Sequence, residues 1–418
     1  MKQRILGPVI ALVVILASTA CGSAKSPGNS NGGAESGKLV VWDWKSSDKN
    51  AQNFVAKAKS DFAKKHPNVT LEFVAQPFEN YYTLLGAAIQ AGKGPDVMLF
   101  NGGGQIRDRT NALLPLDQYV TQDKDRLAGW DAFSKDGKIY AAPITLQGHP
   151  IYYNKSIYTK AGLDPDKPPA TWSAVMAAAK QLTDPAKRVH GFGFCAHQSE
   201  QSVFQFLPWL WQAGGAMDRL DQPEATAALQ FWTDLVRGGF VSPDVINQQQ
   251  SEVMSTFLAG NTAFAVGGPW ELPRFASEAK FQWRVAPLPV KDDKNIQASS
   301  LGGFHFAIPK GAKHVDGAFM VIEQMLDAQI FRQGWNTGGI LAPRSDVEVP
   351  DPNWPQAYKV FRTQMQSATQ RGPHPQWASL SRPLQIAIQE ALTGTKPPAE
   401  ALAGAAAKLR PILAKTPL

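Results

Sequence analysis

Aromatic residues occur in this chain where turns, rather than long helices, are expected. The sequence has 12 Trp, 21 Phe and 8 Tyr. Trp270 follows Gly267-Gly-Pro269, a turn that cannot continue a helix and should present the indole ring. Trp44 ends the first apolar run of the mature chain, and Trp377 follows Pro375 at the start of a helical pattern. Flat rings beside directed polar groups suit ligands with both apolar faces and hydroxyls, as sugars have. Core packing is the alternative for each ring.

A further group of aromatic residues lies in one helical stretch near residues 204–213. Phe204, Trp209 and Trp211 all belong to it. Helical positions two apart point in different directions, so at most two of these rings can face the same cleft. We take Phe204 and Trp211 as candidate ligand contacts, with core packing expected for at least one of the three rings.

Polar candidates follow the ends of predicted strands. Asn101 comes directly after an apolar run and can both donate to and accept from hydroxyls. Glu79 ends the loop after the preceding strand. Arg344 follows Gly338 to Pro343, and its guanidinium could fork onto two hydroxyls or an anion, or form an ordinary salt bridge.

Residues 38–100 alternate between strand and helix patterns. Short apolar runs at 38–44, 69–74 and 96–100 predict strands, and the segments 48–66 and 81–91 predict helices between them. This order predicts a parallel sheet with helices on both faces. Ligands of such sheets bind outside the carboxyl ends of the strands, where Trp44, Glu79 and Asn101 stand.

The first 21 residues have the pattern of an export signal. Lys2 and Arg4 precede an apolar run at 5–17, and small residues lead to Cys21. The run is shorter than the roughly 20 residues that a spanning helix needs. We therefore predict a signal peptide at 1–20, with an uncleaved hydrophobic anchor as the alternative. Residues 21–37 are rich in Gly, Ser and Asn and should form a flexible tether.

Composition limits the remaining possibilities. About 380 residues exceed what one hydrophobic core usually serves, so two domains are expected. The formal net charge is +7, or +5 without Lys2 and Arg4, and it is scattered. The sequence therefore lacks the basic patch that would suggest nucleic-acid binding. Cys195 is the only cysteine besides Cys21, which argues against a disulfide framework or a multi-cysteine metal site. We expect Cys195 to be buried and inert.

A series of short motifs connects the chain with a known family. The motifs are His66-Pro-Asn-Val69, Gly92-Lys-Gly-Pro-Asp-Val97, Asp136-Gly-Lys-Ile-Tyr140 with Pro143, Tyr153-Asn-Lys155, Ala161-Gly-Leu163, Thr171-Trp172, Phe257-Leu-Ala-Gly-Asn261, Gly267-Gly-Pro-Trp270, Pro287-Leu-Pro289, Gly302-Gly303 and Ile308-Pro-Lys-Gly311. Each is weak alone, but their order and spacing extend through most of the mature chain. In this respect the sequence resembles the extracellular solute-binding proteins of family 1, the carbohydrate-binding subunits of ABC importers.

The resemblance implies a fold, a location and partners. The fold class would be α/β, with two periplasmic-binding-protein-like lobes of mixed sheets and flanking helices around a hinge. By analogy the N-terminal lobe comprises 38–147 and 288–332, and the C-terminal lobe 148–287 and 333–418. Residues 16–21 are similar to a lipobox, although Ser18 stands where leucine is usual. Cys21 would then carry the lipid that anchors the protein at the extracellular membrane face, beside its permease.

The resemblance also implies roles for particular residues. Trp270 would stack on a sugar ring. Gln147 and His149 stand where the chain first crosses between lobes, a stretch that gives the family a polar or acidic ligand contact; a hinge histidine is the alternative for His149. Gly302 and Gly303 resemble a glycine pair whose backbone reaches the ligand, and His305 is next to them. No catalytic residue, metal or cofactor is implied.

Other functions were weighed against this interpretation. A glycoside hydrolase needs two placed carboxylates, which counting alone cannot exclude, but no nucleophile-elbow, zinc-protease or phosphate-loop motif is present. The pairs Tyr81-Tyr82 and Tyr152-Tyr153 are similar to those of ferric-ion binding proteins. A polyamine site would need several cleft carboxylates, in which the predicted strand ends are poor.

Overall fold

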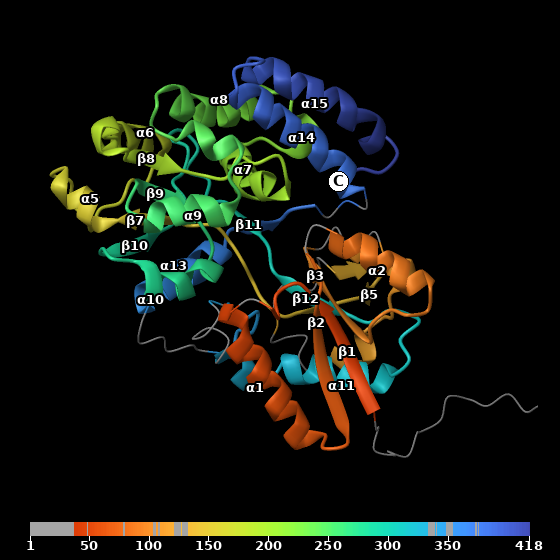
Figure 1. Ribbon diagram of the computed structural model, residues 1–418. Helices are drawn as coiled ribbons and strands as arrows, with labels where there is room; N and C mark the ends of the chain where they lie inside the picture. The colour runs from red at the N-terminus through yellow and green to blue at the C-terminus, as the bar shows by residue number, and fades with distance from the viewer. Residues whose placement is uncertain are drawn as a thin grey trace, which may run out of the picture. The chain divides into compact units, whose positions relative to one another are not determined.

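The first strand, β1 (Gly37–Asp43), buries Leu39, Val41 and Asp43 at alternate positions, as a strand with one face against a core should. It is followed by α1 (Lys49–Lys65), β2 (Val69–Ala75), α2 (Tyr81–Gln90) and β3 (Val97–Asn101). These five elements confirm the predicted alternation of strands and helices to within about two residues at each end (Figure 1).

The computed structural model describes a defined part of the chain. The described residues are 37–47, 49–77, 80–102, 106–107, 109–120, 127, 133–332, 339, 341–347, 354–372, 374 and 376–418. The predicted signal peptide, the tether up to residue 36, Cys21 and Glu79 lie outside these residues. Gly37, predicted as the last tether residue, instead begins β1.

The first sheet has the strand order β2-β1-β3-β12-β6. Strands β2 and β3 run parallel to β1, whereas β12 (Phe304–Ala307) runs antiparallel to β3 and to β6 (Ala142–Pro143). The sheet is therefore mixed, and it joins strands that are about 160 residues apart in sequence. Helix α11 (Val315–Met325) packs against α1 beside it.

Smaller elements complete this part of the chain. They are the 3₁₀ turn η2 (Thr110–Ala112), the short helix α4 (Asp117–Val120), and a hairpin of β4 (Ser134–Lys135) and β5 (Lys138–Ile139). Asp117 accepts a hydrogen bond from the backbone nitrogen of Ile139 at 3.2 Å, which attaches the hairpin to α4.

The second sheet has the order β10-β7-β9-β8. Its strands are β7 (Ile151–Asn154), β8 (His190–Gly193), β9 (Thr262–Val266) and β10 (Trp283–Ala286). Strand β7 runs antiparallel to both of its neighbours, and β8 runs parallel to β9. This sheet is also mixed, so the predicted α/β class with mixed sheets is confirmed.

Helices cover both faces of the second sheet. They are α5 (Lys155–Lys160), α6 (Trp172–Leu182), α7 (Glu200–Gln212), α8 (Pro223–Arg237), α9 (Gln250–Leu258), α10 (Leu272–Glu278), α13 (Pro355–Met365), α14 (Trp377–Leu392) and α15 (Pro398–Leu413), with the 3₁₀ turns η5 (Pro185–Lys187), η6 (Met217–Arg219), η7 (Pro243–Ile246) and η8 (Pro269–Glu271). Helix α6 begins after Thr171, which caps it by accepting from the nitrogen of Ala174 at 3.3 Å.

The alternation along β7 separates two hydrophobic cores. Ile151 and Tyr153 face a core shared with α6, α7, α8, α14 and α15, and these last two helices pack side by side with α8 in Figure 1. Tyr152, between them, faces a second core with α9, α10 and α13. That second core continues without interruption to the first sheet, where it includes Phe100.

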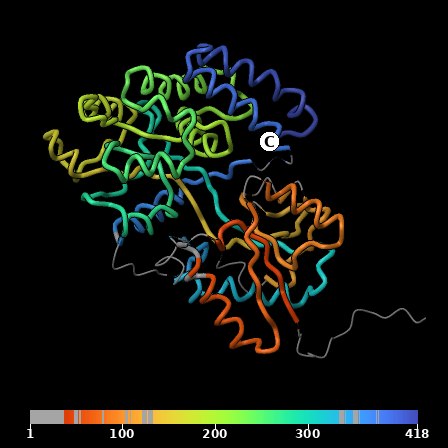
Figure 2. Tube along the Cα trace, in the orientation of Figure 1, coloured from red at the N-terminus to blue at the C-terminus, as the bar shows by residue number. Residues whose placement is uncertain are grey.

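The chain passes between the two sheets several times, and the passing segments are hydrogen-bonded to one another (Figure 2). The nitrogen of Leu146 donates to the oxygen of Leu341 at 2.9 Å. Gln147 and Gly302 exchange two backbone hydrogen bonds of 3.0 and 2.8 Å. Directly before Gly302 in the chain, β11 (Ser299–Leu301) runs parallel to β13 (Ala368–Gln370). We call residues 146–147, 302 and 341 the crossing ladder.

The strands of the two sheets come from different parts of the chain. Every strand of the first sheet lies in 37–143 or 304–307, and every strand of the second lies in 151–286. The exact lobe boundaries, and the hinge motion between the lobes, stay predictions.

Among the described residues, no helix combines the length and the apolar composition that crossing a bilayer requires.

Candidate ligand-binding site

Three of the predicted rings meet beside the crossing ladder. The fully buried imidazole of His149 lies just before β7, Phe204 is in the first half of α7, and Trp270 is in η8. The His149 ring is 4.2 Å from the Phe204 ring and 5.4 Å from the Trp270 ring, centroid to centroid, and both contacts are edge-to-face. Residues 149, 204 and 270, distant in sequence, therefore form one aromatic cluster.

The turn before Trp270 fixes the position of its indole. Pro269 begins η8, and the indole folds back over Gly268, where a Cβ would lie only 2.0 Å from the ring. The hydroxyl of Tyr152 donates to the oxygen of Gly268 at 2.7 Å and holds this turn to β7. Trp270 keeps partial exposure, whereas His149 and Phe204 are buried. Of the three rings, Trp270 is thus the one that belongs to a partly exposed residue.

The glycine pair lies directly against this cluster. A Cβ on Gly302 would be 2.5 Å from Cζ of Phe204, so the phenyl ring packs on the bare backbone. A Cβ on Gly303 would be 2.1 Å from the oxygen of Thr145. Gln147 is half-buried and pairs with Gly302 through its backbone. The glycine pair therefore lies beside Gln147 and the aromatic cluster, while the contact of these residues with a ligand stays a prediction.

The side-chain amide of Gln250 contacts the imidazole of His149. Nε2 of Gln250 is 3.4 Å from Nε2 of His149 and also donates to the oxygen of Gln201 at 3.2 Å. Burial, together with the nearby Arg371, lowers the pKa of His149 to about 3. The ring is consequently neutral at physiological pH, and it offers a hydrogen-bonding group without a charge.

Arg371 belongs to the same site, and the sequence analysis missed it. It follows β13 directly, and its Cζ lies 4.2 Å above the centre of the Phe204 ring. Its Nη1 donates to the oxygen of Glu200 at 3.2 Å, and its Nη2 is 3.5 Å from Oδ1 of Asn101. No local pattern marks this arginine, because its partners are about 170 and 270 residues away in sequence.

Asn101 and Trp44 lie at the same edge of the first sheet, as predicted from the carboxyl ends of their strands. The nitrogen of Asn101 donates to the hydroxyl of Tyr82 at 3.0 Å. Trp44 is 9% exposed and packs edge-on against Tyr81 and Phe304, with centroid distances of 4.8 and 5.6 Å. Trp44 therefore supports the wall of the site more than it offers an open ring face.

Two predicted site residues lie in the interior instead. His305 is 2% exposed on β12, and its ring is 3.8 Å from that of Phe133, a residue of the second core. Trp377 is 6% exposed, and its Nε1 donates to Oε2 of Glu200 at 2.9 Å. Trp377 therefore packs in the interior, which is the alternative named for each aromatic ring.

Arg344 takes the salt-bridge alternative. Its Nε and Nη2 donate to the carboxylate of Asp346 at 2.8 and 2.7 Å, and its Nη1 donates to the oxygen of Leu326 at 2.9 Å. It lines a cavity of about 630 Å³ beside the crossing ladder, together with Lys359 and Arg362. Trp211 is half-buried against the core of the second sheet.

The two tyrosine pairs do not form an iron site. Tyr152 donates to Gly268, and Tyr153 donates to the oxygen of Pro165 at 3.0 Å on the opposite face of β7. Tyr82 accepts from Asn101, and burial raises its pKa to about 12, as it does for Tyr153. Phenols that are engaged and hard to ionise are poor ferric ligands. In the described part of the chain, no three His, Cys, Asp or Glu residues gather as a metal site.

The chain is similar to several known proteins. Residues 43–329 match the family model of the bacterial extracellular solute-binding proteins. A putative binding protein of Brucella abortus (strain 2308) is 25% identical over 250 residues, which cover 57% of this chain and 60% of that protein, less than two thirds of its length. The galactooligosaccharide-binding protein of Bacillus subtilis (strain 168) is 23% identical over 416 residues, covering 95% of this chain and 94% of that protein.

A solved structure extends the comparison to three dimensions. The ABC transporter solute-binding protein of Thermotoga lettingae TMO, bound with α-D-tagatose, has a TM-score of 0.82 and 26% identity, and the match covers 90% of this chain and 100% of that one. The predicted two-lobed α/β fold is thereby confirmed. The family match covers well over half of the sequence, and the chain belongs to the bacterial extracellular solute-binding proteins.

Proposed function

We propose that this protein captures a carbohydrate in the cleft between its two lobes and delivers it to the permease of an ABC importer. The observation that carries the proposal is the aromatic cluster of His149, Phe204 and Trp270, in which the half-exposed indole stands beside amide and guanidinium groups. An open indole face can cover the C–H face of a pyranose or furanose, and the polar groups can bond its hydroxyls.

The likeness to the Bacillus galactooligosaccharide-binding protein and to the tagatose-bound Thermotoga protein supports a sugar ligand. The electrostatics of the site support it as well. His149 is neutral, and Arg371 has the carboxylate of Glu200 at 3.6 Å from its Nη1. A site in which the charges are compensated favours a neutral, hydroxylated ligand over a polycation or a metal ion.

We further propose that the protein binds its ligand without chemically changing it. Hydrolysis of a glycosidic bond requires two available carboxylates facing the bond. The carboxylate of Glu271, next to Trp270, is 3.2 Å from Nη1 of Arg274. That of Glu200 accepts from Trp377 and from the hydroxyl of Ser381. Both carboxylates are thus occupied by structural partners.

The membrane attachment follows from the N-terminal sequence. We propose that Cys21 is lipidated after removal of residues 1–20 and holds the protein at the extracellular membrane face through the 21–36 tether. Cys21→Ser should release the protein from the membrane fraction and abolish labelling by radioactive palmitate. A variant that stays as firmly membrane-bound as the native protein would contradict lipid anchoring.

A thermal-shift screen followed by calorimetry tests the ligand class. The panel comprises mono- and oligosaccharides, including tagatose and galacto-oligosaccharides, with spermidine and ferric citrate as comparators. We expect one or more saccharides to bind and to be recovered unchanged. Binding only to spermidine or ferric ion, or release of a shorter sugar, would refute the proposal.

A variant of the aromatic cluster tests the location of the site. Trp270→Ala should weaken the binding of the identified saccharide about 30-fold or more, which corresponds to about 2 kcal/mol, because the stacking surface is lost. Tyr119→Ala serves as a matched control, since Tyr119 is 44% exposed on α4 and remote from the aromatic cluster in sequence and contacts. Equal affinities of the two variants would contradict the assignment of Trp270.

A further inference from the structure

The buried residue Arg371 contacts both halves of the protein. The Arg371 side chain is 8% exposed. On one side its Nη2 reaches Oδ1 of Asn101, at the end of β3 in the first sheet, at 3.5 Å. On the other side its Nη1 donates to the oxygen of Glu200 at 3.2 Å, and its guanidinium stacks on Phe204 at 4.2 Å, both on α7.

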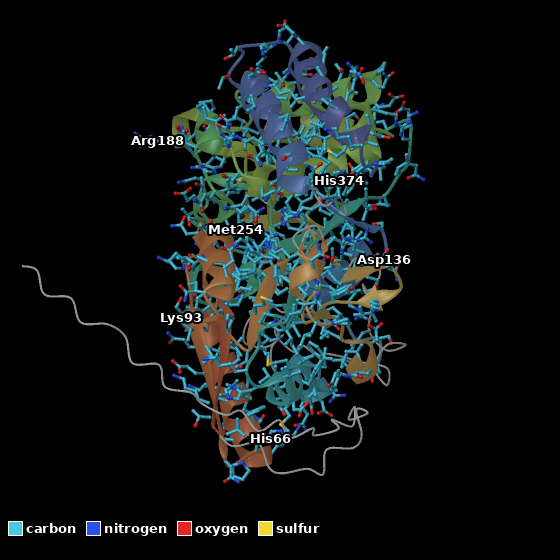
Figure 3. All side chains as sticks on the ribbon, turned by 90° about the vertical axis from the view of Figure 1, so that its right-hand side faces the viewer. His66, Lys93, Asp136, Arg188, Met254 and His374 are labelled. Atoms are coloured by element: carbon cyan, nitrogen blue, oxygen red, sulfur yellow. The ribbon has the colours of Figure 1, made fainter. Side chains whose placement is uncertain are left out.

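The backbone around Arg371 is fixed to the C-terminal half. Gln370, the preceding residue, pairs with Leu301 of β11, a strand that falls in the predicted range 288–332 of the N-terminal lobe but packs against α7 and α13 of the other half. Three residues further on, Nε2 of His374 is 2.7 Å from the oxygen of Thr416, and its Nδ1 accepts from the nitrogen of Gln376 at 2.9 Å. Figure 3 labels His374 in the upper half of the view, above Asp136. Hydrogen bonds of residues on both sides of Arg371 thus hold the backbone that carries its guanidinium.

The other partner is equally well fixed to the first sheet. Asn101 pairs with Phe304 of β12. Its nitrogen donates to the hydroxyl of Tyr82 at 3.0 Å, and the Tyr82 ring carries the guanidinium of Arg109 at 5.1 Å. Because both sides are anchored, rotation of the lobes about the crossing ladder has to separate Arg371 from Asn101. The contacts of Arg371 with Glu200 and Phe204 can persist, since all of these residues belong to the C-terminal half.

The pairing of the buried Arg371 charge with Glu200 also keeps this side chain attached to α7. A buried guanidinium is costly unless it is paired and hydrogen-bonded. Glu200 provides the pairing, with Oε2 at 3.6 Å from Nη1, and is itself oriented by Trp377 and Gln385, at 2.9 and 3.2 Å. Glu200 therefore keeps Arg371 in place when the lobes separate, ready to meet Asn101 again when they close.

We propose that Arg371 is a positioning residue that clasps the two lobes together around the bound ligand, by joining Asn101 of the first sheet to Glu200 and Phe204 of α7. The inference rests on the proposed function in so far as the ligand lies between the lobes. Arg371 then controls how long the closed state lasts. Its loss raises the dissociation rate constant of the ligand and leaves the association rate constant nearly unchanged, because the ligand enters while the lobes are apart.

Stopped-flow kinetics with the saccharide identified by the panel measure the two rate constants. Arg371→Gln should raise the dissociation rate constant about tenfold or more and change the association rate constant less than about threefold. Arg371→Lys should restore part of the loss, because it keeps the charge but not the planar fork. Arg237→Gln, an exposed arginine on α8, is the charge-matched control and should behave as the native protein.

A double-mutant cycle separates a clasp from two independent ligand contacts. If Arg371 acts through Asn101, the double variant Asn101→Ala with Arg371→Gln should release ligand no faster than the more severe of the two single variants. Effects on dissociation that multiply, or an effect of Arg371→Gln that lies wholly in association, would overturn the inference.

A distance measurement tests the clasp independently of the ligand's identity. Spin labels at Lys93→Cys and Lys180→Cys, two exposed positions on opposite sides of the crossing ladder, report the separation of the lobes in full-length Cys21→Ser protein. Arg371→Gln should shift the distance distribution to longer values, and Arg237→Gln should not. An unchanged distribution refutes the clasp even where saccharide binding is established. A shifted distribution in a protein that binds no saccharide supports the clasp and refutes only the proposed ligand.

Discussion

The phenyl ring of Phe204 rests on the backbone of Gly302, at a place where a Cβ would lie 2.5 Å from Cζ of the ring. The contact joins α7 to the crossing ladder, since Gly302 also exchanges two hydrogen bonds with Gln147. The position of the aromatic cluster thus depends on the absence of one side chain.

Gly302→Ala should displace Phe204 and with it the stacked Arg371. We expect saccharide affinity to fall about tenfold or more and stability to fall by about 1–3 kcal/mol, as overpacking of a filled site does. Calorimetry and urea denaturation measure the two effects. Gly404→Ala is the control, because its Cβ meets open space on α15 and should leave binding intact while stability is unchanged or raised. Native affinity in Gly302→Ala would contradict this packing argument.

Burial of His149 predicts a loss of stability in mild acid. Its folded pKa is about 3, mainly because of burial and then because of Arg371, whereas the unfolded value is about 6.5. Between these values the unfolded state binds the extra proton, so stability is complete above about pH 6.5 and falls as the pH is lowered. His149→Gln should reduce the slope of unfolding free energy against pH between 4 and 6 by close to one proton.

The control for this prediction is Gly404→Ala, which changes no titratable group. It should keep the slope of the native protein. His305, buried against Phe133, has its pKa lowered to about 3 as well, mainly by burial, so the native slope contains contributions from both histidines. An identical slope in His149→Gln and the native protein would show that the imidazole is protonated or exposed in the folded state.

Glu271 predicts the opposite dependence on pH. Burial raises its folded pKa to about 7, against the opposing effect of Arg274, from an ordinary value of 4.5. Its contribution to stability is present below about pH 4.5 and is lost as the pH rises through 7. Between pH 5 and pH 8, Glu271→Gln should therefore gain on the native protein by roughly 2–3 kcal/mol in unfolding free energy.

Glu278 provides a matched comparison because it binds the same arginine. Its carboxylate is 2.9 Å from Nη2 of Arg274, and this hydrogen bond lowers its pKa. Glu278→Gln should differ from the native protein by a constant amount between pH 5 and pH 8. Parallel curves for both variants over this range would contradict the assigned pKa of Glu271.

Cys195 should be unreactive in the folded protein. The thiol is fully buried and donates to the oxygen of Gln248 at 3.3 Å, and burial raises its pKa to about 12. In Cys21→Ser protein, a thiol reagent such as 5,5′-dithiobis(2-nitrobenzoate) should react only as fast as the protein unfolds, so the rate should rise with urea. Rapid reaction of the native protein would show that Cys195 is accessible.

Local patterns were sufficient to predict the first sheet's opening strands and helices. The apolar run before Trp44 forms β1, Pro67 follows the end of α1, and Thr171 caps α6. These features depend on neighbours within a few residues, where periodicity and capping act. The short parallel pair β11–β13 was not predicted, because three-residue strands carry no period and their partners are about 70 residues apart.

The candidate site shows the same division between local and distant information. Trp270 lies in the turn that its Gly-Gly-Pro sequence predicts, whereas Trp377, another indole after a proline, packs behind the site on Glu200. A proline stands one or two residues before each of these tryptophans, so this local feature does not distinguish a partly exposed ring from a buried one.

The sequence alone determined the class of fold, the family and the residue types available for a ligand, because these depend on local pattern and on motif order. The tertiary structure decided which of those residues meet. Arg371 approaches Asn101 across 270 residues, and such an approach depends on how two sheets and their crossing segments pack. Packing energies are sums over many distant contacts, and no single stretch of sequence contains them.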